Sequence, residues 1–297
     1  MPDDARGARD AHGARDAAEE ESAFSHPPVD PDATAAYGDH PDQVVDFYAP
    51  RGGEESAPLV VVLHGGAWRA PYDRRHITPF ADFLARRGFA VANVEYRRGG
   101  TIPAQGGTGH VAGRWPETFD DVAAALDAMP VLVRQALPAA DARRTVVTGH
   151  SAGGHLALWA AARHLLPDDA PWRLDRPAPL RGVVALAPIA DFAVAGKLDV
   201  CSGAALQLLG GEEKFEERQP YADPALLLPT GIATTLVQGT TDAVVPQAVA
   251  EAYAEAAAKA GEVVGLTLLE AVGHFPLIDP AADACAVVAE EITQLAW

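Results

Sequence analysis

Short apolar runs alternate with amphipathic stretches along most of this chain. The run Leu59–Leu63 (LVVVL) is continuously apolar, which is typical of a parallel-sheet strand covered on both faces. Further strands are predicted at 43–48, 89–95, 145–148, 181–188, 233–239 and 263–270. Helices are predicted at 76–87, 116–128, 152–166, 247–260 and 280–295. This alternation predicts an α/β fold with a mostly parallel central sheet and helices on both faces.

The first 36 residues have a different composition. They are rich in Ala, Asp, Arg and Glu, contain the near-repeat ARGARDAHGARDA, and have almost no large apolar residue before Phe24. Such a segment buries too little apolar surface to offset its ordering entropy. We therefore expect residues 1–36 to be a disordered or frayed helical tail, and residues 37–297 to form a single domain.

Two stretches inside that domain carry no clear strand pattern. Residues 189–231 contain several prolines and one short helical stretch, and we expect them to form a small insertion over the active site. Residues 97–114 are glycine-rich and predict a mobile loop, which could also lie over the site. Their Gly107-Thr108-Gly109 segment is not followed by Gly-Lys-Ser/Thr, which argues against a phosphate-binding loop.

The segment TVVTGHSAGGHLAL, residues 145–158, carries the strongest chemical signal. A short β-branched run leads into Gly149-His150-Ser151-Ala152-Gly153, and a helix-forming stretch follows at once. This is the G-x-S-x-G turn between a strand and a helix, which exposes a serine oxygen for nucleophilic attack. Ser151 is the one serine of five in this setting, so we predict that it is the nucleophile.

A serine hydroxyl needs a base and an acid that orients the base. In this topology the order is Ser, then Asp or Glu, then His. His274 is the only histidine after His164, and it follows the last predicted strand, so we predict that it is the base. Asp242, in the loop after strand 233–239, is the favoured acid, with Asp191 and Asp279 as rivals.

The oxyanion of the tetrahedral intermediate needs backbone N–H donors. We assign these to Gly66 and Ala67, in the turn after Leu59–Leu63, and to Ala152 at the start of the helix. We also expect an aromatic substrate pocket. Its candidate residues are Trp68, Tyr72 and Trp115.

Charge and composition argue against several classes of binding partner. The net charge of −18 argues against nucleic acids and anionic membrane surfaces. The two cysteines form neither a metal motif nor a disulfide framework, and no apolar run is long enough to span a membrane. The sequence shows no signal-peptide pattern, so we expect a cytoplasmic protein. We expect it to act on a small molecule and to need neither a cofactor nor a metal.

These motifs resemble those of the α/β-hydrolase superfamily, over everything after the first 36 residues. His64-Gly65-Gly66-Ala67-Trp68 is similar to the H-G-G-x-W motif of kynurenine formamidases and related esterases, and residues 149–156 are similar to their extended elbow. In that family the second glycine and the next residue form the oxyanion hole, which implies Gly66 and Ala67. The H-G-G-x-W motif also occurs in carboxylesterases of the hormone-sensitive-lipase type.

The resemblance implies hydrolysis of a small carboxylic ester or amide through an acyl-enzyme, most specifically by a kynurenine formamidase-like (arylformamidase-like) enzyme. A general short-chain carboxylesterase is the alternative. A third hypothesis is a catalytically silent ligand-binding scaffold, although such scaffolds normally lack a triad member, and here all three are present. A peptidase would need a large additional domain to select peptides. Neither the substrate nor the oligomeric state follows from the sequence.

Overall fold

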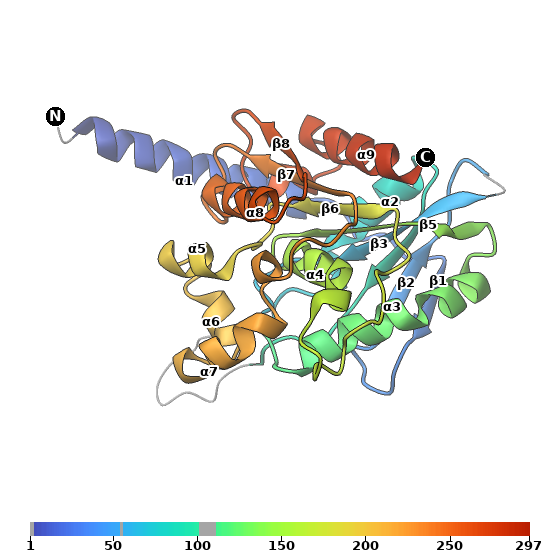
Figure 1. Cartoon of the computed structure of the whole chain (residues 1–297). Coiled ribbons are helices and arrows are strands. Elements are labelled where there is room, and N and C mark those ends of the chain that lie inside the picture. The colour runs from blue at the N-terminus through green and yellow to red at the C-terminus, as the bar shows by residue number, and fades with distance from the viewer. Residues whose placement is uncertain (1–2, 54–55, 101–110) are drawn as a thin grey trace.

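An eight-stranded sheet forms the centre of the computed structural model, which describes residues 3–53, 56–100 and 111–297 (Figure 1). The strand order is β1-β2-β4-β3-β5-β6-β7-β8. Strands β3 to β8 run parallel to one another. At one edge, β2 pairs antiparallel with β4, and β1 pairs antiparallel with β2. The strands are β1 (Ala33–Ala36), β2 (Val44–Tyr48), β3 (Ala57–Leu63), β4 (Ala90–Val94), β5 (Ala140–His150), β6 (Gly182–Leu186), β7 (Thr234–Gly239) and β8 (Gly265–Leu269). The predicted mostly parallel α/β fold is confirmed.

Helices cover both faces of the sheet. Alternate residues of β3 point to opposite faces, so that Leu59, Val61 and Leu63 join one apolar cluster while Val60 and Val62 join the other. The first cluster includes residues of α3 (Glu117–Ala136), α4 (Ala152–Ala161) and α8 (Gln247–Lys259). The second includes residues of α2 (Thr78–Ala85) and α9 (Asp283–Ala296). Burial on both faces explains the continuous apolar pattern of the central strands.

The parallel strands place the candidate chemistry at one edge of the sheet. The carboxyl ends of β3, β5, β7 and β8 lead directly into the turns that carry Gly66, Ser151, Asp242 and His274, respectively. Ligands of open α/β sheets bind outside the carboxyl ends of the strands. Four segments far apart in sequence are therefore brought to one site.

Two elements are much longer than the sequence predicted. Strand β5 begins at Ala140, where it pairs with Ala57 of β3, rather than at Thr145. Helix α3 continues past Pro130 to Ala136, because buried residues such as Val133 hold its last turns against the core.

The segment between β6 and β7 contains only short helices among its described elements. They are α5 (Phe192–Lys197), α6 (Ala204–Leu208) and α7 (Glu212–Arg218), followed by the 3₁₀ turns η3 (Gln219–Tyr221) and η4 (Pro224–Leu226). Of the predicted 97–114 loop, residues 101–110 lie outside the described part. Both described ends of that loop contact the Trp68 carbonyl, which accepts hydrogen bonds from the N–H groups of Gly99 (2.9 Å) and Gly113 (2.7 Å).

The N-terminal segment, predicted as a disordered or frayed helical tail, contains one helix and one strand. Helix α1 (Asp3–Phe24) projects from the body in Figure 1, and β1 pairs with β2 through residues 33–36. Strand β1 is held mainly by backbone pairing, as in Ala33 opposite Phe47, so apolar content alone did not predict it. In the described residues, no helix combines the length and apolarity needed to cross a membrane.

Candidate active site

Ser151 lies on a sharp turn between β5 and α4. Its backbone has φ 56° and ψ −118°, and its N–H donates to the Leu186 carbonyl at 2.8 Å. The flanking glycines are required by close packing. A Cβ on Gly149 would lie 2.3 Å from the Gly153 carbonyl oxygen, and one on Gly153 would lie 2.0 Å from that of Leu63. The strained backbone at Ser151 is thus held by contacts that only glycine permits.

His274 and Asp242 form a buried hydrogen-bonded pair. The imidazole Nδ1–H donates to Asp242 Oδ2 at 2.7 Å. The other carboxylate oxygen, Oδ1, accepts from the N–H groups of Val244 (2.9 Å) and Val245 (2.8 Å). Because Nδ1 carries the proton in this bond, a neutral imidazole has an unprotonated Nε2 that can accept a proton.

The two rival carboxylates are engaged elsewhere. Asp191 caps α5 by accepting from the Val194 N–H at 2.8 Å. Asp279 accepts from Ser22 Oγ at 2.6 Å and is paired with His26 Nε2 at 2.7 Å. Of the three candidates, Asp242 is the one hydrogen-bonded to His274.

The turn after β3 lies beside Ser151. Gly66 (φ 103°), Ala67 (φ 50°) and Trp68 (φ 54°) all have positive φ, and Gly66 and Ala67 line the same cavity as Ser151. Ala152 is the first residue of α4, where backbone N–H groups have no intrahelical acceptor and the helix dipole favours negative charge. The three predicted donors are therefore placed around the serine.

A buried network holds the turn in place. His64 Nε2 is 2.8 Å from Glu95 Oε1, and the Tyr96 hydroxyl donates to the His64 carbonyl at 2.6 Å. The Tyr96 ring also stacks on the His64 ring at a centroid distance of 4.3 Å. Burial opposes the charge of Glu95, but the neighbouring His64 and Arg98 lower its pKa to about 2. His64 accordingly supports the turn and does not line the cavity.

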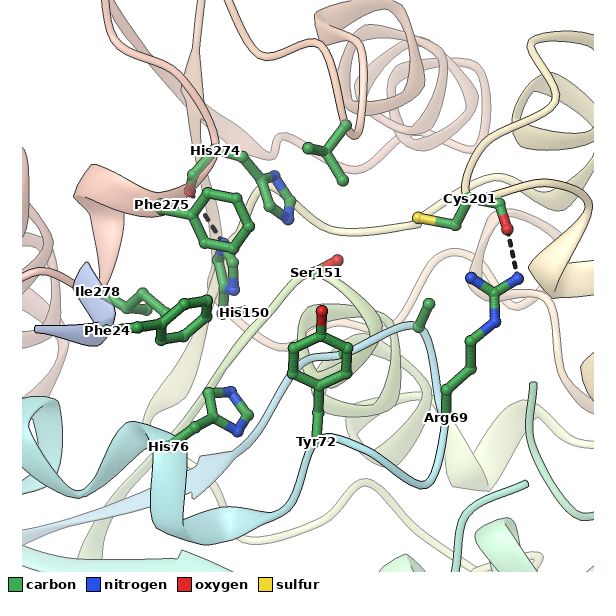
Figure 2. A pocket seen from close by; sticks show the side chains of 13 residues that line it. Phe24, Arg69, Tyr72, His76, His150, Ser151, Cys201, His274, Phe275 and Ile278 are labelled. Carbon is green, nitrogen blue, oxygen red and sulfur yellow. Dashed lines mark hydrogen bonds between the residues drawn. The ribbon is translucent and has the colours of Figure 1, made fainter. Parts of the chain in front are cut away.

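Ser151 and His274 open into a cavity of about 140 Å³ (Figure 2). Its lining residues are Phe24, Gly66, Ala67, Arg69, Tyr72, His76, His150, Ser151, Cys201, Val244, His274, Phe275 and Ile278. Figure 2 shows aromatic rings and Ile278 on one side of Ser151, and Arg69 with Cys201 on the other. The Arg69 guanidinium donates through Nη2 to the Cys201 carbonyl at 2.6 Å.

Of the three aromatic residues predicted to line the pocket, Tyr72 lines this cavity. The Trp68 side chain is instead fully buried and packs edge-on against His155 at 5.1 Å, because the chain turns sharply at this residue and directs the indole into the core. Trp115 packs against Phe119 (5.3 Å) and Trp172 (5.5 Å) in an aromatic cluster and is not among the residues that line this cavity.

Sequence reasoning missed two lining residues with evident roles. His150, inside the elbow motif, donates through Nε2 to the His274 carbonyl at 3.0 Å. Burial and the neighbouring His274 imidazole hold the pKa of His150 well below its ordinary value, so His150 stays neutral. Phe24 comes from the segment predicted as a tail. The only feature of the sequence that could have pointed to Phe24 is that it is the first large apolar residue after a polar stretch. Within the described residues, no three His, Cys, Asp or Glu side chains are grouped to hold a metal ion.

Comparison with known families identifies the chain. Residues 45–256 match the BD-FAE model, which represents α/β-hydrolase esterases and spans most of the chain. The chain belongs to the BD-FAE family.

Two solved esterases have a fold similar to that of this BD-FAE chain. Esterase B from Lactobacillus rhamnosis has a TM-score of 0.72 at 19% identity and covers 99% of this chain and 96% of its own. Thermogutta terrifontis esterase 2 has a TM-score of 0.65 at 21% identity, covering 91% and 95% respectively. At these identities, the likeness concerns the fold.

A curated rice protein is also similar. The probable isoprenylcysteine alpha-carbonyl methylesterase of Oryza sativa subsp. japonica is 25% identical over 252 residues, which is 80% of this chain. The chain spans 56% of the length of that relative. The matched family and this rice relative are esterases rather than formamidases, so they favour the carboxylesterase alternative over the formamidase prediction.

Proposed function

We propose that this BD-FAE chain is a carboxylesterase that hydrolyses small esters with Ser151, His274 and Asp242. The 2.7 Å hydrogen bond between Asp242 and His274, with His274 lining the same cavity as Ser151, carries this proposal. A cavity of about 140 Å³ favours a small substrate. An apolar cavity of about 150 Å³ is known to hold a molecule of the size of benzene.

The mechanism follows from the pairings around the imidazole. Ser151 Oγ attacks the ester carbonyl while His274 Nε2 takes its proton, and Asp242 stabilises the resulting imidazolium. The N–H groups of Gly66, Ala67 and Ala152 stabilise the oxyanion. His274 then protonates the leaving alcohol, which departs as the acyl-enzyme forms. Water activated by His274 releases the acid and restores Ser151.

A paired assay tests this function. Purified protein and its Ser151→Ala variant would be assayed with p-nitrophenyl acetate, butyrate and octanoate, and with N-formylkynurenine. We expect the wild type to hydrolyse the short esters and Ser151→Ala to lose this activity. We expect only weak release of formate from N-formylkynurenine. Strong preference for N-formylkynurenine would instead support the arylformamidase hypothesis, for which the H-G-G-A-W segment at 64–68 is the specific observation.

A labelling experiment separates the enzyme from a silent scaffold. A fluorophosphonate probe reacts with an activated serine, so we expect labelling of the folded wild type at Ser151 and none in Ser151→Ala. A folded wild type that neither labels nor turns over any of these substrates would support the silent scaffold and contradict the proposed function.

A further inference from the structure

The second half of α1 contacts both loops that carry the imidazole and its carboxylate. Arg15 Nη2 donates to Thr241 Oγ1 at 2.7 Å, next to Asp242. Glu19 Oε1 accepts from the Gly273 N–H at 3.3 Å, next to His274. Because these contacts join segments more than 200 residues apart in sequence, α1 is held against the catalytic edge of the sheet.

The residues around the end of α1 add a second attachment. Ser22 Oγ donates to Asp279 Oδ2 at 2.6 Å, and His26 Nε2 lies 2.7 Å from Asp279 Oδ1. Asp279 follows η5 (Phe275–Leu277), the turn directly after His274. Burial raises the pKa of Asp279, but the Ser22, Ala281 and His26 hydrogen bonds outweigh it and hold the pKa below its ordinary value. The carboxylate therefore binds Ser22 and His26 in its charged form.

These attachments fix the position of Phe24 between them. Its ring packs edge-on against Phe275 at a centroid distance of 5.4 Å and against His76 at 5.7 Å. In Figure 2, Phe24 lies beside Ile278 on the side of Ser151 opposite Arg69. Phe24 lines the same cavity as Ser151 and His274, and so forms part of its apolar wall.

We propose that Phe24 is a specificity-determining residue, which limits the length of the apolar group that the cavity accepts beside the scissile carbonyl. The inference rests on the proposed esterase function. The surrounding Phe275, His76 and Ile278 belong to the body of the domain, whereas Phe24 is supplied by a helix whose polar contacts to the catalytic loops hold it in place. The N-terminal segment is therefore a component of the substrate site.

A smaller or a larger side chain at position 24 should shift the preference for acyl chain length in opposite directions. Phe24→Ala opens space at the apolar wall, and each additional buried methylene is worth about a fourfold gain in affinity. Octanoate has several more methylenes than acetate to place in that space. We therefore expect the ratio of kcat/KM for p-nitrophenyl octanoate to kcat/KM for p-nitrophenyl acetate to rise at least ~10-fold. Phe24→Trp should lower the same ratio, because its larger ring fills part of the cavity.

Phe83→Ala is the matched control. Phe83 is a buried phenylalanine of α2 outside this cavity, with the Arg87 guanidinium 3.5 Å from its ring centroid. It should lower the melting temperature by loss of apolar burial while leaving the chain-length ratio unchanged. Melting temperature and fluorophosphonate labelling of every variant would show that each is folded.

The outcomes separate this inference from the proposed function. Opposite shifts of the ratio in Phe24→Ala and Phe24→Trp, with none in Phe83→Ala, support the inference. Equal losses on all esters, or the same ratio in all variants, would overturn it while the esterase function stands. A wild type that hydrolyses none of the esters would overturn both.

Discussion

Replacement of Gly153 by alanine tests the closest approach in the active site. Gly153 belongs to the first turn of α4, directly behind the carboxyl end of β3. A Cβ at this position would lie 2.0 Å from the Leu63 carbonyl oxygen and 2.5 Å from that of His64. Both obstacles are backbone atoms, so no side-chain rotation relieves the overlap.

The size of the effect follows from that geometry. To bring the nearest contact from 2.0 Å to an ordinary separation of 3.4 Å, α4 must move from β3 by roughly 1.4 Å. Overpacking of a core typically costs about 1–3 kcal/mol of unfolding free energy, and a collision with fixed backbone belongs at the upper end, about 3 kcal/mol. The same movement displaces Ser151 relative to Gly66, and a misplacement of about 1 Å can lower catalysis by about 100-fold.

Gly196→Ala is the control of the same chemistry. Gly196 lies in α5, and a Cβ there would meet no atom within 4 Å. Alanine is favoured over glycine in a helix by about 0.5–1 kcal/mol, so this variant should be slightly more stable than the wild type. Urea unfolding would measure both free energies, and kcat/KM with p-nitrophenyl butyrate would measure the catalytic effect. If Gly153→Ala kept wild-type stability and activity, the close packing of β3 and α4 would be refuted.

Three other changes give separable results. Asp242→Asn should lower kcat by about 10⁴-fold with little change in KM, because the amide favours the wrong tautomer of His274; near-wild-type kcat would exclude Asp242 as the orienting acid. Gly66→Ala should lower kcat by about 100-fold, because its φ of 103° is strained for alanine and the new Cβ would lie 2.3 Å from the Tyr72 Cβ; an unchanged kcat would remove this turn from the oxyanion hole. Burial lowers the pKa of His155 to about 3, so the unfolded state binds more protons below pH ~6.5, and unfolding free energy should fall as pH drops toward 3. The contribution of His155 to that loss is about 2 kcal/mol at pH 5, measurable by urea unfolding at pH 7 and pH 5, and a His155→Gln variant with the same pH dependence as wild type would contradict it.

The sequence by itself determined the parallel part of the sheet and the order of the chemical groups. Apolar runs such as 59–63 predict buried parallel strands, because a strand covered on both faces has no polar face to alternate with. Each parallel strand ends at the same edge, so motif order alone placed Ser151, Asp242 and His274 near one another. These inferences depend on local patterns and on topology, which a single sequence carries.

Only the tertiary structure decided which side chains share a cavity. Trp68 and Trp115 were predicted to line the pocket, but the Trp68 indole is buried in the core and the Trp115 indole packs against it, since backbone dihedrals and neighbouring rings set side-chain direction. Phe24 reaches the cavity from a segment with little apolar content, because specific polar contacts to loops more than 200 residues away hold its helix. Such contacts leave no periodic signal, so they depend on the folded arrangement of the whole chain.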